Sequence, residues 1–295
     1  MSKDYFLDKD GDFNALSLVI LGWNKKIAII IATILFGIGG FFYSNFLDET
    51  WTARTTLIPT EASQAGPAGA RASTLINLTG VSLGGAVGVS NAQLAQELMV
   101  SRDFFKKLIS DEFNLINLMA MQKYENGSPV YDPDIYDSKK NQWILKPDFF
   151  PAYRVFRSGL EIDYSWDKGG FINVSFTHKS PVFAAQFLNT IINEVNTLKR
   201  DKDIEQAEAQ LEYLIVESRN ATNADLKRAL SGLMQNQLKS KMFAKTRDFY
   251  LVEPLDSVYE PALRTTPQRR LITLIFLILG FSASFIYVTV KKFLE

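Results

Sequence analysis

Two long uncharged apolar runs, one near each end, constrain this chain more than any other feature. They cover residues 27–47 and 271–290. A helix of about 20 residues crosses a hydrocarbon core of roughly 30 Å, so each run predicts a transmembrane helix. A cleaved signal peptide is the alternative for the first run. That run is longer than the apolar core of a signal peptide, and no convincing small-residue cleavage pattern follows it.

The charges beside the two runs predict the orientation of the chain. Two lysines precede the first run and two acidic residues follow it, so the positive-inside rule places residues 1–26 in the cytoplasm. A second crossing returns residues 291–295 to the same side and leaves residues 48–268 on the other. The second run does not support this orientation by itself, because two arginines before it balance two lysines after it.

Small residues occur four positions apart within each run. The pairs are Gly40 with Ser44 and Gly280 with Ser284. Such spacing lets membrane helices approach closely, so we expect these four residues to lie where the two spans pack. Neither run contains a charged residue. Because ion and proton pathways need ionisable groups within the membrane, we do not expect a channel or transporter built from these helices alone.

The composition excludes several classes of function. The chain has 32 basic and 32 acidic residues, and this balance argues against a nucleic-acid partner. It has no cysteine, which excludes disulfides, thiolate metal sites and a cysteine nucleophile. The one histidine, His178, cannot build a multi-histidine metal site, and we expect it to be exposed at the end of a strand. Acidic pairs such as Asp111/Glu112 indicate solvated surface. We therefore expect no catalytic, cofactor-binding or metal site.

Alternating patterns predict a β-sheet between the two runs. Residues 51–58 alternate and are rich in threonine, which is typical of a strand. Residues 160–166 and 171–177 also alternate, and the turn sequence at 167–170 separates them, so they predict a hairpin.

Three other stretches have weaker patterns. Residues 1–24 have apolar positions at helical spacing, which indicates an amphipathic helix lying along a membrane. Residues 61–90 are rich in Gly, Ala and Ser but lack the Gly-Lys-Ser/Thr of a nucleotide-binding loop, so a mobile or interfacial loop is expected. Asn91 is expected to cap one helical stretch that reaches residue 113.

A long helical region follows the predicted hairpin. Between Pro181 and Glu253 there is no further proline, and Gly232 is the one glycine. A break is expected at residues 220–223, because asparagine and threonine favour helix caps over helix interiors. Beyond Lys199 large apolar residues become scarce, so this part must project into solvent or pack against copies of itself. A coiled coil is the competing explanation, but no sustained heptad is present.

Three prolines lie between the helical region and the second run: Pro254, Pro261 and Pro267. Proline fixes φ and disfavours helix at the preceding residue, so they predict a stiff, extended connector beside the membrane. The expected organisation is a segment at 1–26, a span at 27–47, a large domain at 48–268, a span at 271–290 and a tail at 291–295. Within the large domain we expect a base formed by residues 48–180 and 248–268, and a long helical region at 181–247.

Several of these segments resemble the polysaccharide co-polymerase family, the Wzz-type chain-length determinants. They are the first span followed by WTARTTLIP, the loop sequence LTGVSLGG, ELMVSRDFFKKLI at 97–109, THKSPVFAAQFLNTIINEV at 177–195, and YLVEPLDSVYEPALRTTPQRRLI before the second span. The proline-rich segment before the second span is the most specific of these features. One departure is that the second span contains a single glycine, Gly280, where the family is often glycine-rich.

The resemblance implies an α+β fold with two transmembrane helices flanking a periplasmic α/β base domain with a long protruding helix. It implies a homo-oligomeric ring in the inner membrane of a Gram-negative bacterium, in contact with membrane lipids. It further implies a non-enzymatic regulator of chain length in lipopolysaccharide biosynthesis, whose partners are the O-antigen polymerase and the growing lipid-linked polysaccharide. The alternatives are a structural adaptor in capsule or exopolysaccharide export and a membrane-bound sugar hydrolase or transferase.

Overall fold

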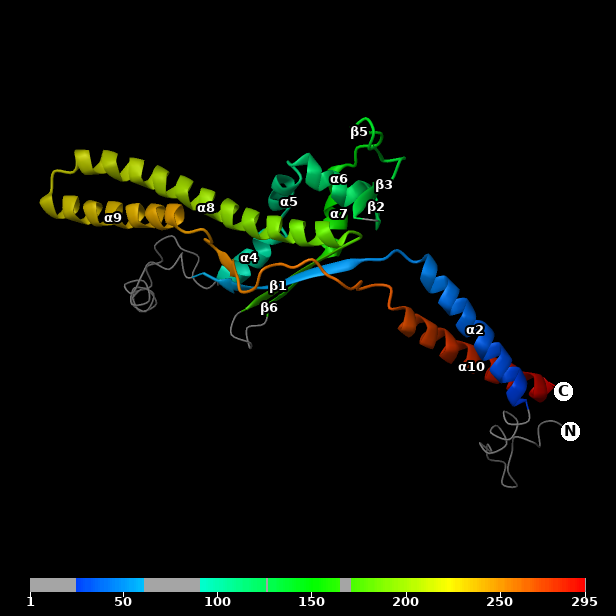
Figure 1. Cartoon of the computed structure of the whole chain (residues 1–295). Helices are drawn as coiled ribbons and strands as arrows, with labels where there is room; N and C mark the ends of the chain where they lie inside the picture. Colours follow the sequence, from blue (N-terminus) through cyan, green and yellow to red (C-terminus); the bar gives the residue numbers. More distant parts are fainter. Residues whose placement is uncertain (1–24, 61–90, 126, 165–170, 295) are drawn as a thin grey trace, which may run out of the picture. The chain divides into compact units, whose positions relative to one another are not determined.

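The computed structural model describes residues 25–60, 91–125, 127–164 and 171–294 (Figure 1). The chain divides into two compact units, which we describe one at a time. The smaller unit comprises residues 1–50 and 264–295, and the larger comprises residues 51–263. The expected amphipathic helix at 1–24 and the glycine-rich loop at 61–90 lie outside the described residues.

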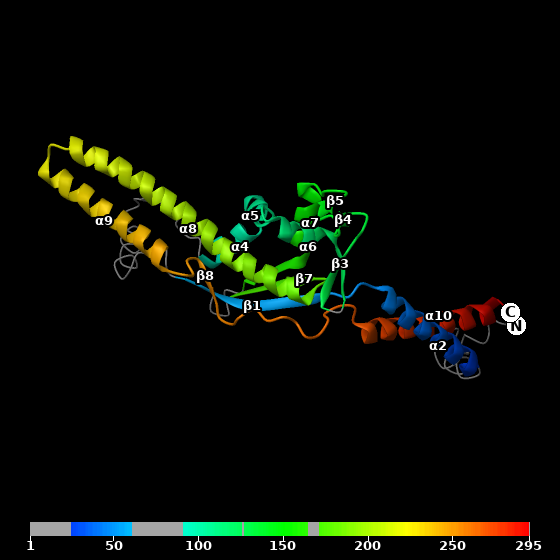
Figure 2. The ribbon, with the colours of Figure 1, turned by 45° about the horizontal axis from the view of Figure 1, so that its top comes forward.

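The smaller unit contains two apolar helices that pack against each other (Figures 1 and 2). They are α2 (Lys26–Phe46) and α10 (Arg269–Leu294). Both are long and apolar enough to cross a membrane, by length and composition. The two runs recognised in the sequence are therefore helical. Together with a large polar unit, these two apolar terminal helices fit a membrane protein.

The larger unit is built on an antiparallel four-stranded sheet with the order β6-β7-β1-β8. The strands are β1 (Trp51–Pro59), β6 (Leu160–Tyr164), β7 (Ile172–His178) and β8 (Val252–Pro254). The predicted strand at 51–58 and the predicted pairing of the two later strands are confirmed. The predicted turn at 167–170 lies outside the described residues.

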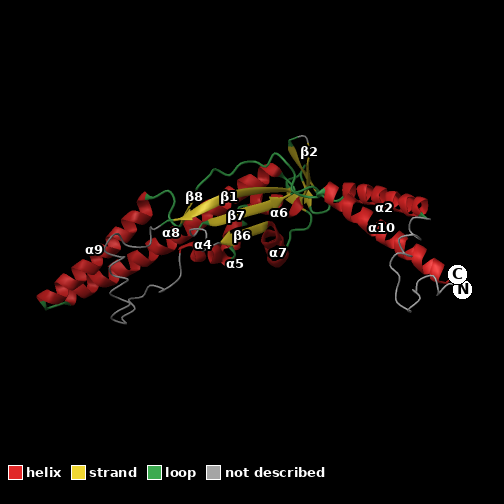
Figure 3. Ribbon diagram, turned by 90° about the horizontal axis from the view of Figure 1, so that it is seen from below, coloured by secondary structure: helices red, strands yellow, loops and turns green. Residues whose placement is uncertain are grey.

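One face of this sheet is covered by α7 (Phe149–Gly159), α8 (Pro181–Asn220) and α4 (Asn91–Met99) (Figure 3). Alternation places every second strand residue under these helices, where Leu57 and Phe176 are fully buried. The main core lies here because phenylalanines from α8 and α7, including Phe187 and Phe156, pack onto the same side. This covered face explains the alternation that the sequence shows.

The prediction of one continuous helical stretch from Asn91 to residue 113 is wrong. The chain instead forms three short helices, α4, α5 (Arg102–Leu108) and α6 (Glu112–Ala120). The side chain of Ser101 accepts a hydrogen bond from the Phe104 N–H, and that of Asp111 accepts one from the Phe113 N–H. Both residues therefore act as N-caps and start a new helix within the predicted one.

The polar stretch that follows forms two small antiparallel hairpins. Their strands are β2 (Met121–Glu125), β3 (Ser128–Tyr131), β4 (Tyr136–Asp137) and β5 (Gln142–Trp143). The Trp143 ring nitrogen donates to Glu112 at 2.9 Å, which fastens the second hairpin to α6.

The long helical region is two antiparallel helices rather than one (Figures 1 and 2). Ser180 caps α8 and Pro181 occupies its first turn, where a missing N–H costs nothing. The break predicted at residues 220–223 is present, because α8 ends at Asn220 and α9 (Ala224–Thr246) begins after the capping residue Asn223. The chain then turns back along α8. We call these two helices beyond Asn196 the helical hairpin.

Candidate functional site

The contact between α2 and α10 is made through glycines. A Cβ atom added to Gly40 would lie 2.6 Å from the Cβ of Phe276, and one added to Gly280 would lie 2.5 Å from the Cβ of Phe36. A methyl group does not fit at either distance, so both glycines stand where the helices approach most closely. Gly37, which the sequence analysis missed, faces the Leu277 side chain at 2.6 Å in the same way. Its spacing of three residues from Gly40 is the signal that could have found it.

The two serines predicted for this contact differ in position. Ser44 is fully buried, whereas Ser284 is half-exposed. Each hydroxyl donates within its own helix, Ser44 to the Phe41 carbonyl and Ser284 to the Phe281 carbonyl, both at 2.9 Å. Neither hydroxyl therefore bonds across the helix pair.

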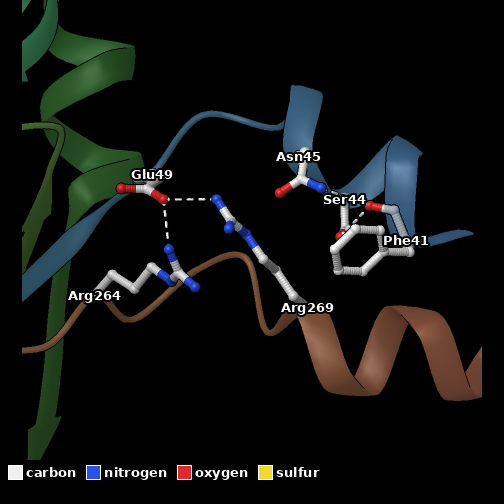
Figure 4. A network of polar contacts seen from close by, with 6 residues as sticks. All are labelled: Phe41, Ser44, Asn45, Glu49, Arg264 and Arg269. Atoms are coloured by element: carbon white, nitrogen blue, oxygen red, sulfur yellow. Dashed lines mark hydrogen bonds and ion pairs between the residues drawn. The ribbon is translucent and has the colours of Figure 1, made fainter.

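A polar network lies at the end of α2 and the start of α10 (Figure 4). One carboxylate oxygen of Glu49 accepts from the Arg264 guanidinium at 2.6 Å and from the Arg269 guanidinium at 2.8 Å. Next to it, Thr50 and Thr266 form an isolated β-bridge, with their hydroxyls 2.7 Å apart. The chain leaving α2 is thus tied to the chain entering α10. The sequence analysis used these charges for orientation alone and missed the pairing.

The three prolines of the predicted connector occupy different settings. Pro254 ends β8, the edge strand of the sheet, opposite Leu57. An edge strand tolerates the missing N–H of proline. Pro261 is half-buried in an irregular segment of the larger unit, and Pro267 is buried in the smaller unit just before α10.

The helical hairpin has almost no core of its own. Beyond Asn196, the buried apolar side chains in α8, α9 and the turn between them are three alanines, Ala207, Ala221 and Ala244. Large apolar side chains are instead exposed: Tyr213, Ile215, Val216, Leu226, Leu233, Leu238, Met242 and Phe243. A cavity of about 400 Å³ lies between the two helices, bordered by Tyr213, Leu214 and Leu233. Exposed apolar surface on this scale is typical of an interaction surface.

An ion pair joins the two helices of the hairpin. Lys241 of α9 forms an ion pair with Glu208 of α8 at 2.8 Å. The hydrogen bond from Lys241 and its positive charge lower the pKa of the Glu208 carboxyl. The Glu208 side chain is exposed and that of Lys241 is half-buried, so the pair contributes to alignment more than to stability.

One face of α8 holds the segment that connects α9 to β8, in an arrangement that we call the clamp. The buried amide oxygen of Asn196 accepts from the N–H groups of Tyr250, Leu251 and Val252 at 2.7–3.0 Å. Its amide nitrogen donates to the Val252 carbonyl at 2.9 Å. One turn further, Arg200 donates to the carbonyls of residues 247 and 248 at 2.8 and 2.6 Å.

A third turn of α8 completes the clamp. The Tyr250 hydroxyl donates to Asp203 at 2.7 Å, and Lys199 forms an ion pair with the same carboxylate. Burial, together with the hydrogen bond to Asp203, raises the pKa of the Tyr250 phenol. The clamp therefore fixes where the helical hairpin joins the sheet.

The prediction that His178 is exposed is wrong. It does end strand β7, but it is only 8% exposed and packs between the rings of Phe176 and Phe183. Its Nδ1 accepts the Ser180 N–H at 3.2 Å, next to the start of α8. Burial and, secondarily, the charge of Lys179 lower the pKa of His178 to about 4. The residues that bury it are Phe176, two positions earlier in β7, and Phe183 near the start of α8.

Within the described ranges, no group of three or more histidine, cysteine, aspartate or glutamate side chains is arranged to hold a metal ion.

Comparison with known proteins identifies one family by sequence. Residues 14–112 match the family described as Wzz, chain length determinant protein. This match contains α2, β1, α4 and α5, and it confirms the resemblance found in the sequence. No curated protein sequence matches the chain.

Some solved structures are also similar to this chain. One is a full-length bacterial polysaccharide co-polymerase, with 14% identity and a TM-score of 0.39, and the match covers 94% of this chain and 97% of that one. Another is a fragment of WzzB, a polysaccharide co-polymerase from Salmonella Typhimurium, with 13% identity and a TM-score of 0.30, covering 74% of this chain and 100% of that one. The family match by sequence covers residues 14–112 of this chain.

Proposed function

We propose that the chain sets the length of the O-antigen of lipopolysaccharide, or of a related surface polysaccharide, without catalysing a reaction itself, because residues 14–112 match the Wzz chain length determinant family. The family match is the observation that carries this proposal. The protein acts in the inner membrane of a Gram-negative bacterium, with α2 and α10 as its spans. Both termini lie in the cytoplasm and residues 48–268 lie in the periplasm.

The protein works as a homo-oligomeric ring. Support comes from the helical hairpin, whose large apolar side chains are exposed in a single chain. Copies packed side by side would remove this surface from water, which is worth about 25 cal/mol for each Å² buried.

The polymerase is an integral membrane partner, and the growing lipid-linked polysaccharide is the polymer that both proteins handle. We place the polymerase contact at the paired spans and at the connector with Pro254, Pro261 and Pro267. Support comes from the close glycine contact at Gly40 and Gly280, which gives α2 and α10 one shared surface for a partner.

The test is the ladder of surface polysaccharide on a gel from the source bacterium, with the gene deleted and then restored. We expect deletion to remove the modal band while polymer still forms, and restoration to return it. Polymer that disappears from the surface or accumulates inside the cell would favour an export adaptor. An unchanged ladder would contradict the proposed function.

A further inference from the structure

The face of the central sheet opposite the helices is strongly polar. Alternation sends every second residue of β1, β6 and β7 to this side, away from the buried core. Six of the residues on this side line a groove: Arg54, Thr56, Glu161, Asp163, Asn173 and Ser175. Apart from Thr56 and Ser175, which are half-buried, their side chains are exposed.

Strand register arranges these side chains in two rows across the sheet. Glu161 pairs with Ser175, which pairs with Arg54, and these form the first row. In the second row, Asp163 pairs with Asn173, which pairs with Thr56. Neighbouring strands lie about 4.8 Å apart, so each row presents hydrogen-bonding groups at regular steps. The Thr56 hydroxyl donates to the Asn173 side-chain oxygen at 2.8 Å, which leaves the Asn173 amide nitrogen outward as a donor.

The chain after β8 makes one wall of this surface. The Leu255 N–H donates to the Thr56 carbonyl, and the Thr55 hydroxyl donates to the Asp256 carbonyl, each at 2.8 Å. These bonds fix the segment against β1 and bring Asp256, Ser257 and Tyr259 to the border of a groove of about 640 Å³. Ligand sites commonly have volumes of about 300–1,000 Å³. The Tyr259 side chain is largely free, since the residue is 74% exposed.

Several groups in the groove are available to a ligand. Within the part of the chain that the structure describes, the side chains of Arg54, Asp163 and Asp256 form no hydrogen bond or ion pair. Three carboxylates, Glu161, Asp163 and Asp256, face one guanidinium. Their excess negative charge disfavours phosphate groups, and therefore disfavours lipid headgroups and nucleic acid. The sheet rows contain no large apolar side chain, which disfavours the apolar face of a helix.

We propose that this groove binds a short stretch of an uncharged glycan. Sugar hydroxyls donate and accept hydrogen bonds, so they suit a surface that mixes carboxylates, a guanidinium, an amide and hydroxyls. The exposed Tyr259 ring at the border offers a flat apolar surface for the carbon–hydrogen face of a sugar ring. The identity of the glycan as the polymer whose length is regulated rests on the proposed function, whereas the groove chemistry does not.

The test measures direct binding to the full chain in lipid nanodiscs. The probe is lipid-free polysaccharide of a few repeat units, released from the surface of the source bacterium and fractionated by size. Binding is followed by saturation-transfer NMR and by titration calorimetry. We expect Tyr259→Ala and Asp163→Asn each to weaken binding about tenfold, because each removes one ligand-facing group from an exposed position.

Matched variants outside the groove serve as controls. Leu263→Ala changes an exposed residue of the same connector, and Asp134→Asn changes an exposed aspartate on another loop. We expect both to bind within twofold of the wild type. Absence of binding by the wild-type chain, or equal binding by groove and control variants, would overturn the proposal.

Two further results separate this proposal from its alternatives. If the substitutions in the groove cause the oligomer to dissociate, the groove is an interface between copies and the glycan proposal is overturned. If deleting the gene changes the polysaccharide ladder as expected but groove variants bind normally, the groove proposal fails and the proposed function stands. If the ladder is insensitive to the gene but the chain binds glycan through Tyr259, the proposed function fails and the groove proposal stands.

Discussion

The two halves of α8 form one continuous helix but carry opposite surfaces. In the first half, Phe183, Phe187 and Ile191 are buried against the sheet. In the second half, beyond Asn196, Ala207 is the one buried side chain of the helix, while Tyr213 and Ile215 are exposed. Both halves belong to the same helix, so they differ only in which other parts of the chain pack against them.

This difference shows what one chain can stabilise by itself. The first half gains most of its stability from tertiary packing of its apolar face, as protein helices generally do. Beyond the clamp, the second half packs along α9, whose own large side chains are also exposed. The chain itself therefore leaves the apolar surface of this half exposed to solvent. We propose that further copies of the chain bury it.

The largest expected difference in stability is between two isoleucine-to-alanine substitutions, one in each half of α8. Ile191→Ala creates a cavity in the core and should cost about 2–5 kcal/mol of stability. Ile215→Ala, in the same helix, removes a side chain that is 43% exposed and should cost less than about 1 kcal/mol. Thermal unfolding of the full chain in mild detergent, conducted at a concentration where it is monomeric, measures both. Equal losses of stability for the two variants would contradict the difference in burial between the two halves of α8.

The clamp marks the boundary between the halves, and the next expected effect lies there. Asn196→Ala leaves three buried N–H groups of residues 250–252 without their acceptor, which should cost about 3 kcal/mol or more. Asn193→Ala is the matched control, because Asn193 lies one turn earlier and is exposed. The same unfolding assay compares them. A loss for Asn196→Ala no larger than that of the control would show that the clamp does not stabilise the junction.

The start of the first half should be sensitive to acid through His178. Its pKa is about 4 in the folded chain and about 6.5 when unfolded, so between these values the unfolded chain binds more protons. Stability should therefore fall as the pH drops from about 6.5 to 4, by as much as about 3 kcal/mol, and this contribution should level off below pH 4.

The variant that tests this is His178→Gln, which carries no charge at any pH. The unfolding temperatures of the wild type and the variant are measured from pH 7 to pH 4. We expect the unfolding temperature of the variant to fall less steeply with decreasing pH than that of the wild type. Parallel curves would mean that acid acts on other groups.

The smallest expected effect concerns the other close helix pair, α2 and α10. Gly40→Leu forces the helices apart at Phe276, whereas a Cβ atom added at Gly39 meets nothing within 4 Å. Overpacking a close contact typically costs about 1–3 kcal/mol, so Gly40→Leu should lower the detergent unfolding temperature by only a few degrees. Gly39→Leu should leave it unchanged. An equal response would place the tight contact elsewhere.

Much of the fold follows from local patterns in the sequence. Alternation in residues 51–58 and 171–177 predicts strands because one sheet face is buried, and the asparagines at 220 and 223 predict the helix break because they favour caps. Ser101 and Asp111 carried similar cap signals within an apolar periodic stretch, and the periodicity concealed them.

What the sequence does not predict depends on pairing between distant residues. The burial of His178 requires Phe183 from the next helix, and the Glu49 pair requires residues more than 200 positions away. The polar rows of the groove depend on a register that joins β1 to β7 and β7 to β6. No local pattern records these contacts, so they are visible only once the chain is folded.

The most direct test of the account is the mass of the full chain in lipid nanodiscs or mild detergent. The exposed apolar surface of the helical hairpin predicts a wild-type assembly several times the mass of one chain. Combining Ile215→Asp with Met242→Asp should reduce it toward single chains, whereas Ser231→Asp, an exposed polar position on the same hairpin, should not. A wild-type chain that is monomeric, or an assembly indifferent to the two aspartates, would contradict the claim that copies complete the helical hairpin.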